Sequence, residues 1–128
     1  MDIPEALAIQ AFRATNGEFA WTRAQALEVV TVLAGRNVAI LGGELWWVLG
    51  AAGGWSGMIP QENGPDAVYA WETKRLPDEP WSAFVQRCAS ETLVAVKDLP
   101  RPGELPSNLS GRILYNLTWV SESDYDES

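Results

Sequence analysis

One nearly uncharged run in the middle of the chain limits what this sequence can fold into. Eleven of the twelve residues 38–49 are apolar or glycine, and Glu44 carries the only charge. The run mixes β-branched and aromatic residues, which suit the pleated surface of a sheet. Two adjacent glycines, Gly42 and Gly43, are typical of a bulge or of a close approach between backbones. We therefore predict a central strand over residues 38–49 that is kinked at these glycines and carries one carboxylate among indoles.

The length and the apolar pattern indicate one soluble domain. A chain of 128 residues can bury enough surface for a single core. No apolar run reaches the ~18 residues of a membrane span, and the start of the chain lacks the basic region of a signal peptide. The single cysteine, Cys88, cannot form an internal disulfide, which fits a reducing compartment. We expect a cytoplasmic protein that does not associate with membranes.

The chain is acidic, and this narrows the class of partner. Seventeen acidic side chains against nine basic ones give a net charge of −8. Nucleic acid is a disfavoured partner because its phosphates need a basic face. A basic protein is favoured, mainly because opposite charges speed the encounter. The other interpretation is that the charge serves solubility alone.

Three helices are predicted from capping signals and from apolar residues at helical spacing. In chain order they run from Asp2 to Asn16, from Thr22 to Gly35 and from Asp78 to Asp98. The third has the clearest apolar stripe, and Cys88 lies on it. An apolar setting makes a thiol inert, so we interpret Cys88 as a packing residue.

Two further strands complete the predicted sheet, over residues 67–74 and 112–121. Both faces of the last strand contain apolar residues, so we place it inside the sheet. Residues 50–65 include seven glycines and prolines and are predicted to form a loop. The fold class is α+β, an antiparallel sheet of three or more strands packed with three helices in the order α-α-β-β-α-β. The acidic tail, residues 122–128, is expected to fray unless Tyr125 docks on the domain.

Seven tryptophans in one small domain leave an open question about exposure. Trp46 and Trp47 are adjacent in a predicted strand and therefore point to opposite faces of the sheet. Either one of them is exposed as a binding anchor, or helices cover both faces. Trp55, alone in the glycine-rich loop, either plugs a gap in the core or awaits a ligand.

Few side chains are suited to catalysis. The chain has no histidine, which removes histidine-based nucleophile pairs and metal ligands, and a lone cysteine excludes cysteine-rich zinc sites. We predict no cofactor and no metal site. Glu44 and Glu72 both lie in aromatic strands and remain a candidate acid–base pair. The other interpretation is that each faces solvent or pairs with Lys74, Arg75 or Arg112.

Four motifs rich in aromatic residues lie within residues 21–125. They are Gly42-Gly43-Glu44-x-x-Trp47, Tyr69-Ala70-Trp71, Glu79-Pro80-Trp81-x-x-Phe84-Val85 and Tyr115-Asn116-x-Thr118-Trp119-Val120-Ser121-Glu122-x-x-Tyr125. Together they resemble small immunity proteins of bacterial polymorphic-toxin systems, the cognate inhibitors of contact-dependent or type VI-delivered toxins. The resemblance implies a non-enzymatic protein that binds a toxin domain and occludes its active site.

Charge and resemblance together predict an interface with a basic toxin domain. The residues expected there are acidic or aromatic, as hot spots often are: Glu44, Trp46, Trp55, Glu72, Glu122 and Asp124. The alternative function is a small-molecule binding module, in which residues 50–65 close over a tryptophan-lined pocket.

Overall fold

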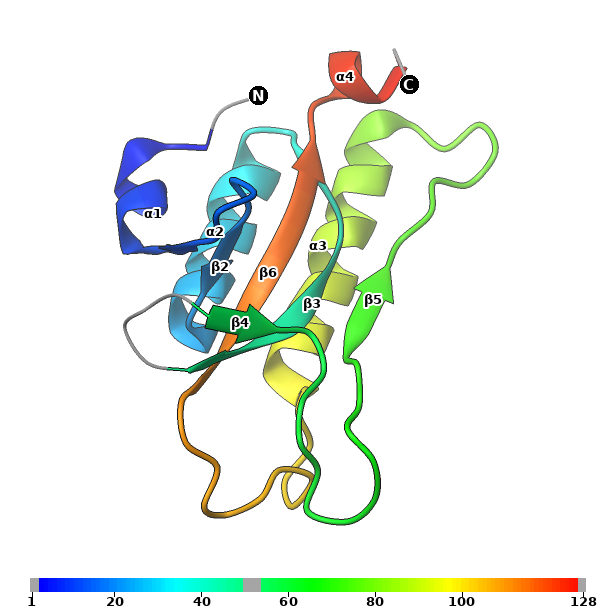
Figure 1. Cartoon of the computed structure of the whole chain (residues 1–128). Helices are drawn as coiled ribbons and strands as arrows, with labels where there is room; N and C mark the ends of the chain where they lie inside the picture. The colour runs from blue at the N-terminus through cyan, green and yellow to red at the C-terminus, as the bar shows by residue number, and fades with distance from the viewer. Residues whose placement is uncertain (1–2, 50–53, 127–128) are drawn as a thin grey trace.

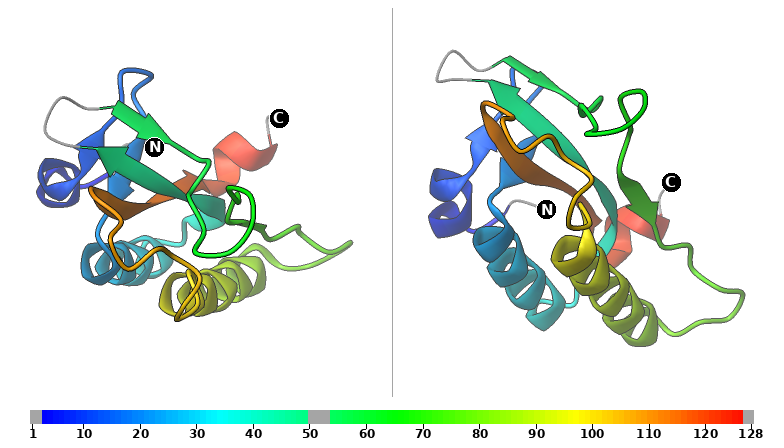
Figure 2. Two further views of the ribbon diagram at one scale, coloured as in Figure 1. Left: turned by 60° about the horizontal axis from the view of Figure 1, so that its bottom comes forward. Right: turned by 90° about the horizontal axis from the view of Figure 1, so that it is seen from below.

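A curled antiparallel sheet with two long helices on one face forms the body of the molecule (Figures 1 and 2). The structure is a computed structural model that describes residues 3–49 and 54–126. The predicted α+β class and antiparallel sheet are confirmed. In chain order the described elements are α1 (Glu5–Gln10), β1 (Phe12–Arg13), β2 (Phe19–Trp21), α2 (Arg23–Gly35), β3 (Ala39–Leu49), β4 (Gly54–Ser56), β5 (Ala70–Glu72), α3 (Trp81–Asp98), β6 (Arg112–Val120) and α4 (Glu122–Asp126). This order differs from the predicted one, and the described residues contain four helices instead of three.

Strand β3 is the centre of the sheet, as its apolar sequence predicted. The strand order is β1-β2-β6-β3-β4, and β5 also pairs with β3. One edge of β3 therefore carries β6 along most of its length, while β5 and β4 share the other edge. The prediction that the last strand lies inside the sheet is confirmed, because β6 runs between β2 and β3. The predicted strand over residues 67–74 is shorter, since only β5 pairs as a strand.

The two glycines of β3 combine a bulge with a close approach. The register between β3 and β6 shifts between Ile40 and Gly42. A Cβ atom on Gly42 would lie 2.2 Å from the carbonyl oxygen of Trp71 in β5, and one on Gly43 would lie 2.2 Å from that of Asn116 in β6. Neither position has room for a side chain, so glycine is required where the two neighbouring strands press against β3.

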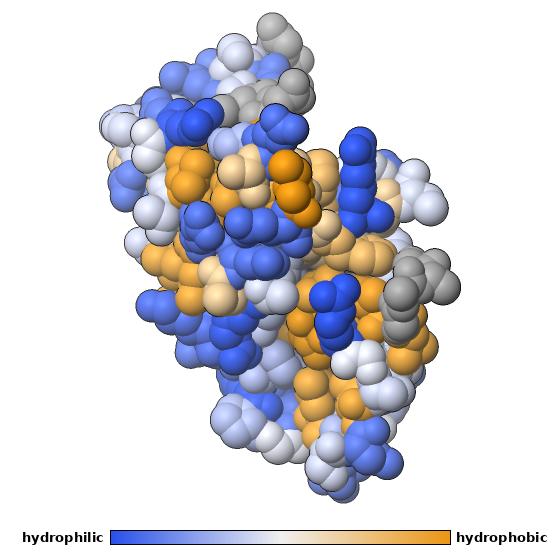
Figure 3. Space-filling view, turned by 90° about the vertical axis from the view of Figure 1, so that its left-hand side faces the viewer, coloured by the Kyte–Doolittle hydropathy of each residue, from blue (hydrophilic) through white to orange (hydrophobic). Residues whose placement is uncertain are grey.

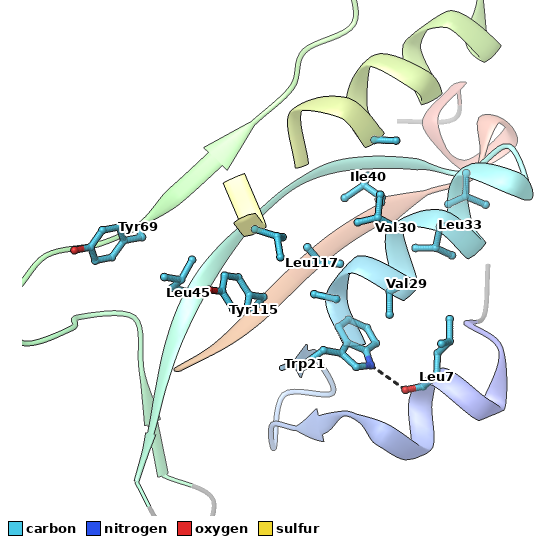
Figure 4. Packing of buried hydrophobic residues seen from close by; sticks show 14 of the residues in the cluster. Leu7, Trp21, Val29, Val30, Leu33, Ile40, Leu45, Tyr69, Tyr115 and Leu117 are labelled. Carbon is cyan, nitrogen blue, oxygen red and sulfur yellow. Dashed lines mark hydrogen bonds between the residues drawn. The ribbon is translucent and has the colours of Figure 1, made fainter. Parts of the chain in front are cut away.

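The main core lies between the sheet and the helices α2 and α3 (Figure 4). It is apolar throughout, and its fully buried members include Trp21, Val29, Leu33, Ile40 and Leu45. The indole N–H of Trp21 donates to the carbonyl oxygen of Leu7 at 2.9 Å, which fastens α1 to this core. Helix α3 runs along the other half of the sheet, where its buried face contains Cys88, as its apolar spacing predicted.

The first predicted helix is too long, because Asn16-Gly17 forms a hairpin turn instead of a helix end. Gly17 has a φ of +88°. Its N–H donates to the carbonyl oxygen of Ala14, and the N–H of Ala14 donates to the carbonyl oxygen of Glu18. This turn joins β1 to β2. Helix α1 has only six residues, a length that is marginal without tertiary contacts. Asp2, the predicted start, lies outside the described residues.

A second apolar cluster covers part of the opposite face, which Figure 1 views from the front. Trp46 is 0 % exposed there, because Trp55 stacks on it with ring centroids 4.0 Å apart and Phe12 packs edge-on at 6.1 Å. Trp47 faces the helices and donates to the carbonyl oxygen of Ser110. Both tryptophans are thus covered, but Trp46 is covered by Trp55 and the β1–β2 hairpin and not by a helix. The loop predicted over residues 50–65 contains β4, and its residues 50–53 lie outside the described part.

Replacing Gly42 by alanine should destabilise the protein by about 1–3 kcal/mol, because the new methyl group forces β5 away from β3. Gly54→Ala in β4 is the matched control, since nothing lies within 4 Å of a Cβ at that position. Urea unfolding followed by tryptophan fluorescence measures both variants. Equal stabilities for the two would contradict the close approach described here.

Candidate functional site

A groove with a volume of about 720 Å³ crosses the face of the sheet that the helices leave open. Its floor is the backbone of Gly42 and Gly43, and its walls come from β5, β6, the start of β2 and α4. Thr118 and Asn116 of β6 lie opposite Gly42 and Glu44 in the register and line the groove as well. The hollow exists because the tight strand packing leaves no side chain on the floor.

Three glutamates line this groove: Glu44 of β3, Glu72 of β5 and Glu18 of the turn before β2. Glu44 lies opposite Ala70 and Glu72 lies opposite Gly42, so the two carboxylates occupy diagonal positions on the same face of neighbouring strands. Glu72 is well exposed and forms an ion pair of 3.5 Å with Lys74. Two residues predicted as interface residues, Glu44 and Glu72, are therefore brought together.

The carboxylate of Glu44 is held in place by the buried tryptophan pair. The indole N–H of Trp46 donates to Oε1 of Glu44 at 2.9 Å. Trp46 itself is fixed between Trp55 and Phe12, so the hydrogen bond has a rigid donor. Trp46 has no exposed surface with which to touch a partner, whereas Trp55 is half-buried beside it. The geometry assigns Trp46 the positioning of Glu44.

Helix α4 closes one end of the groove with Tyr125. The ring of Tyr125 packs on Trp81 and Phe84 with centroid distances of 5.4 and 5.8 Å. The guanidinium of Arg75 lies over both Trp81 and Tyr125 and is 3.8 Å from Asp126. Tyr125 therefore docks on the domain. We expected the tail to fray unless this contact formed. Residues 127 and 128 lie outside the described part.

Both remaining predicted interface residues are exposed on α4, namely Glu122 and Asp124. They lie on the same short helix as Tyr125, and of the three only Tyr125 lines the groove. Glu18 was missed because Asn16-Gly17 was interpreted as a helix end; the same dipeptide is a strong hairpin signal, and a hairpin would have placed Glu18 on a strand.

The predicted tryptophan-lined pocket under residues 50–65 has no counterpart in either of the two grooves that we describe. Neither groove is lined by a residue of that loop. On the side formed by α1 and the β1–β2 hairpin, hydrophobic side chains lie in separate patches with hydrophilic ones between them (Figure 3). Large continuous apolar patches are what mark hydrophobic interfaces. We therefore centre the candidate site on the acidic groove.

Among the described residues, no three potential metal ligands come close enough to hold an ion. No helix in the described ranges is long and apolar enough to cross a membrane. Glu44 and Glu72 share the groove, and their action as an acid–base pair stays a prediction.

Cys88 should be unreactive in the folded protein. Burial raises the pKa of its thiol to about 11, and the side chain is 0 % exposed, so neither thiolate nor access is present near neutral pH. Labelling with a disulfide reagent should become at least ~100-fold faster when urea unfolds the chain. Rapid labelling of the native protein would contradict this assignment.

Glu79→Gln should destabilise the protein near neutral pH and lose this effect in acid. Arg87 donates to both carboxylate oxygens of Glu79 and to the carbonyl oxygen of Lys74, which anchors the segment after β5 to α3. These hydrogen bonds, with one from the Leu76 N–H, lower the pKa of Glu79 from 4.5 to about 2. Because the folded pKa is the lower one, the stabilisation is complete above pH 4.5 and is lost as the pH falls towards 2.

Urea unfolding of wild type and Glu79→Gln at several pH values from about 7 down to 3 measures this difference. Glu28→Gln, which removes an exposed carboxylate from α2, corrects for the change in net charge. A stability difference that is the same at every pH would show that the ion pair with Arg87 contributes nothing.

Comparison with known proteins assigns no family to this chain. No family model, curated protein or solved structure shows a significant match to it. The resemblance to immunity proteins therefore rests on the sequence motifs alone, and a function has to be argued from the groove and its chemistry.

Proposed function

We propose that this chain is a non-enzymatic immunity protein that binds the basic face of a cognate toxin domain and occludes its active site. The observation that carries the proposal is the convergence of Glu18, Glu44 and Glu72, from two strands and a turn, on one open groove. Such a groove fits cationic side chains from a convex partner surface. The sequence motifs that resemble immunity proteins support the same class.

The distribution of charge supports a role in fast recognition. The net charge of −8 attracts a basic partner from a distance, and the acids of α4 stand at one end of the groove. Charges at the rim of an interface act mainly on the association rate, whereas desolvated charges act on dissociation. We assign the first role to Glu122 and Asp124 and the second to the half-buried Glu44.

A fixed acidic side chain suits a tight inhibitor. An ordered carboxylate loses little conformational entropy when it meets a cation, because the hydrogen bond from Trp46 already orients it. Trp55 stands beside it and offers the apolar contact area that often surrounds a charged hot spot. In this proposal Glu44 and Trp55 touch the toxin, and Trp46 supports them from below.

Glu44→Gln and Glu72→Gln should each weaken binding of the toxin domain about 30-fold, equivalent to about 2 kcal/mol, because each leaves a cation of the partner without its counter-charge. The partner to test is the toxin domain encoded by the neighbouring reading frame. Isothermal titration calorimetry measures the affinity, and Glu28→Gln on the exposed face of α2 is the matched control, with less than about a twofold change.

Two outcomes separate the site from the function. Wild-type protein that neither binds nor inhibits that toxin overturns the proposed function. Inhibition that persists in the triple variant Glu18→Gln, Glu44→Gln, Glu72→Gln keeps the function and overturns the groove as its site. Stopped-flow measurements add a third check, because the association rate should fall about tenfold or more as salt is raised from low to high concentration.

A further inference from the structure

A second groove, of about 880 Å³, lies on the helix side of the sheet. It runs along the second half of α3 and is bounded by residues 99–102, by Trp71 of β5 and by Arg23 at the start of α2. Its volume falls in the range of sites that bind small molecules, roughly 300–1,000 Å³. The acidic groove and the proposed toxin interface do not use it.

Basic side chains outnumber acidic ones in this groove, although the protein as a whole is acidic. Three of the nine basic side chains line it: Arg23, Lys97 and Arg101. In the part of the chain that the structure describes, none of the three lies within 4.0 Å of a carboxylate. Two acids also line it, Asp98 and Glu91, but the latter is 3.1 Å from Arg87 in an ion pair.

The guanidinium of Arg23 is fixed by neutral oxygens. Its Nε donates to the carbonyl oxygen of Val96 at 2.9 Å and to the hydroxyl of Tyr115 at 3.2 Å, and its Nη2 donates to the carbonyl oxygen of Leu99 at 3.0 Å. These partners orient the side chain and leave its positive charge without an anion. A preorganised cation of this kind favours an anionic ligand group.

Most of the remaining residues that line the groove are apolar, with Ser90 and the two acids as exceptions. Val94 is 59 % exposed although it is a large hydrophobic side chain, and Pro100 and Pro102 line the groove next to it. The ring of Trp71 is held by its indole N–H, which donates to Thr92 at 3.2 Å. One fixed cation and two exposed basic side chains beside apolar groups and an aromatic ring are the complement of a molecule with one charged end and one apolar body.

We propose that this groove binds a small amphipathic anion, an apolar chain or ring system that carries one carboxylate or sulfonate. The anionic group lies among Arg23, Lys97 and Arg101, and the apolar body lies on Val94 and Trp71. The two grooves share only Trp71, and none of the residues proposed to touch the toxin lines this one, so either assignment can fail without the other.

The test uses the fluorescent sulfonate 8-anilinonaphthalene-1-sulfonate and its uncharged counterpart N-phenyl-1-naphthylamine. The sulfonate should bind the folded protein at least about tenfold more tightly than the uncharged probe, and laurate should displace it. The double variant Lys97→Gln, Arg101→Gln should weaken the sulfonate about tenfold and leave the uncharged probe within about twofold. Lys74→Gln, an exposed cation at the acidic groove, is the matched control.

Nuclear magnetic resonance locates the probe in the same experiment. The indole N–H signal of Trp71, assigned with Trp71→Phe, should shift on titration with the sulfonate, while those of Trp46 and Trp55 should not. Equal affinities for the two probes, an equal loss in Lys74→Gln, shifts confined to the acidic groove or no binding at about 1 mM probe would each overturn the proposal. Near-ultraviolet circular dichroism confirms that each variant is folded.

Discussion

At Gly42 and Gly43 the central strand lies so close to both neighbours that a single methyl group does not fit between them. The approach is from two sides, since β5 presses on Gly42 and β6 on Gly43. Without this close approach β5 would have no partner in the sheet, because β5 pairs with β3. Because both positions must be glycine, the middle of the open face has no side chains there. The groove forms at this place.

The two faces of the sheet meet different chemical demands. One face is apolar and packs on α2 and α3 to form the core. The other is divided: the Trp46–Trp55 pair covers one part, and the acidic groove occupies the next. The hydrogen bond from Trp46 to Glu44 crosses the boundary between them. The groove on the helix side is lined by three basic and two acidic side chains, whereas the groove on the open face is lined by three glutamates together with Lys74 and Arg75.

The long elements could be predicted from sequence because their periodicity extends over many residues. Strand β3, strand β6 and helix α3 have 11, 9 and 18 residues, and each follows its predicted span closely. The elements that sequence reasoning missed, β1, β2, β4 and α4, have two to five residues. Segments this short have no usable period, and contacts distant in sequence hold them. Trp55 stacks on Trp46 and Tyr125 packs on Trp81.

The candidate site was predictable to the extent that strand alternation determines which face a residue occupies. Glu44 and Glu72 share a face because their strands pair in a regular register. Glu18 depended on the choice between a helix end and a hairpin at Asn16-Gly17, and local sequence permits both. For Trp46, strand alternation predicted the face of the sheet on which the side chain lies. It did not predict that the ring of Trp55 covers it.

The alternation of faces along β3 also separates positions that tolerate substitution from positions that the core constrains. Leu45 lies in the packed interior, and Glu44 next to it faces the open groove. A mutation at Glu72 or Thr118 alters the surface offered to a partner and leaves the core contacts in place, whereas one at Glu44 also alters the acceptor of the Trp46 indole N–H. Such a layout lets descendants of one sequence diverge in binding specificity without first losing their fold.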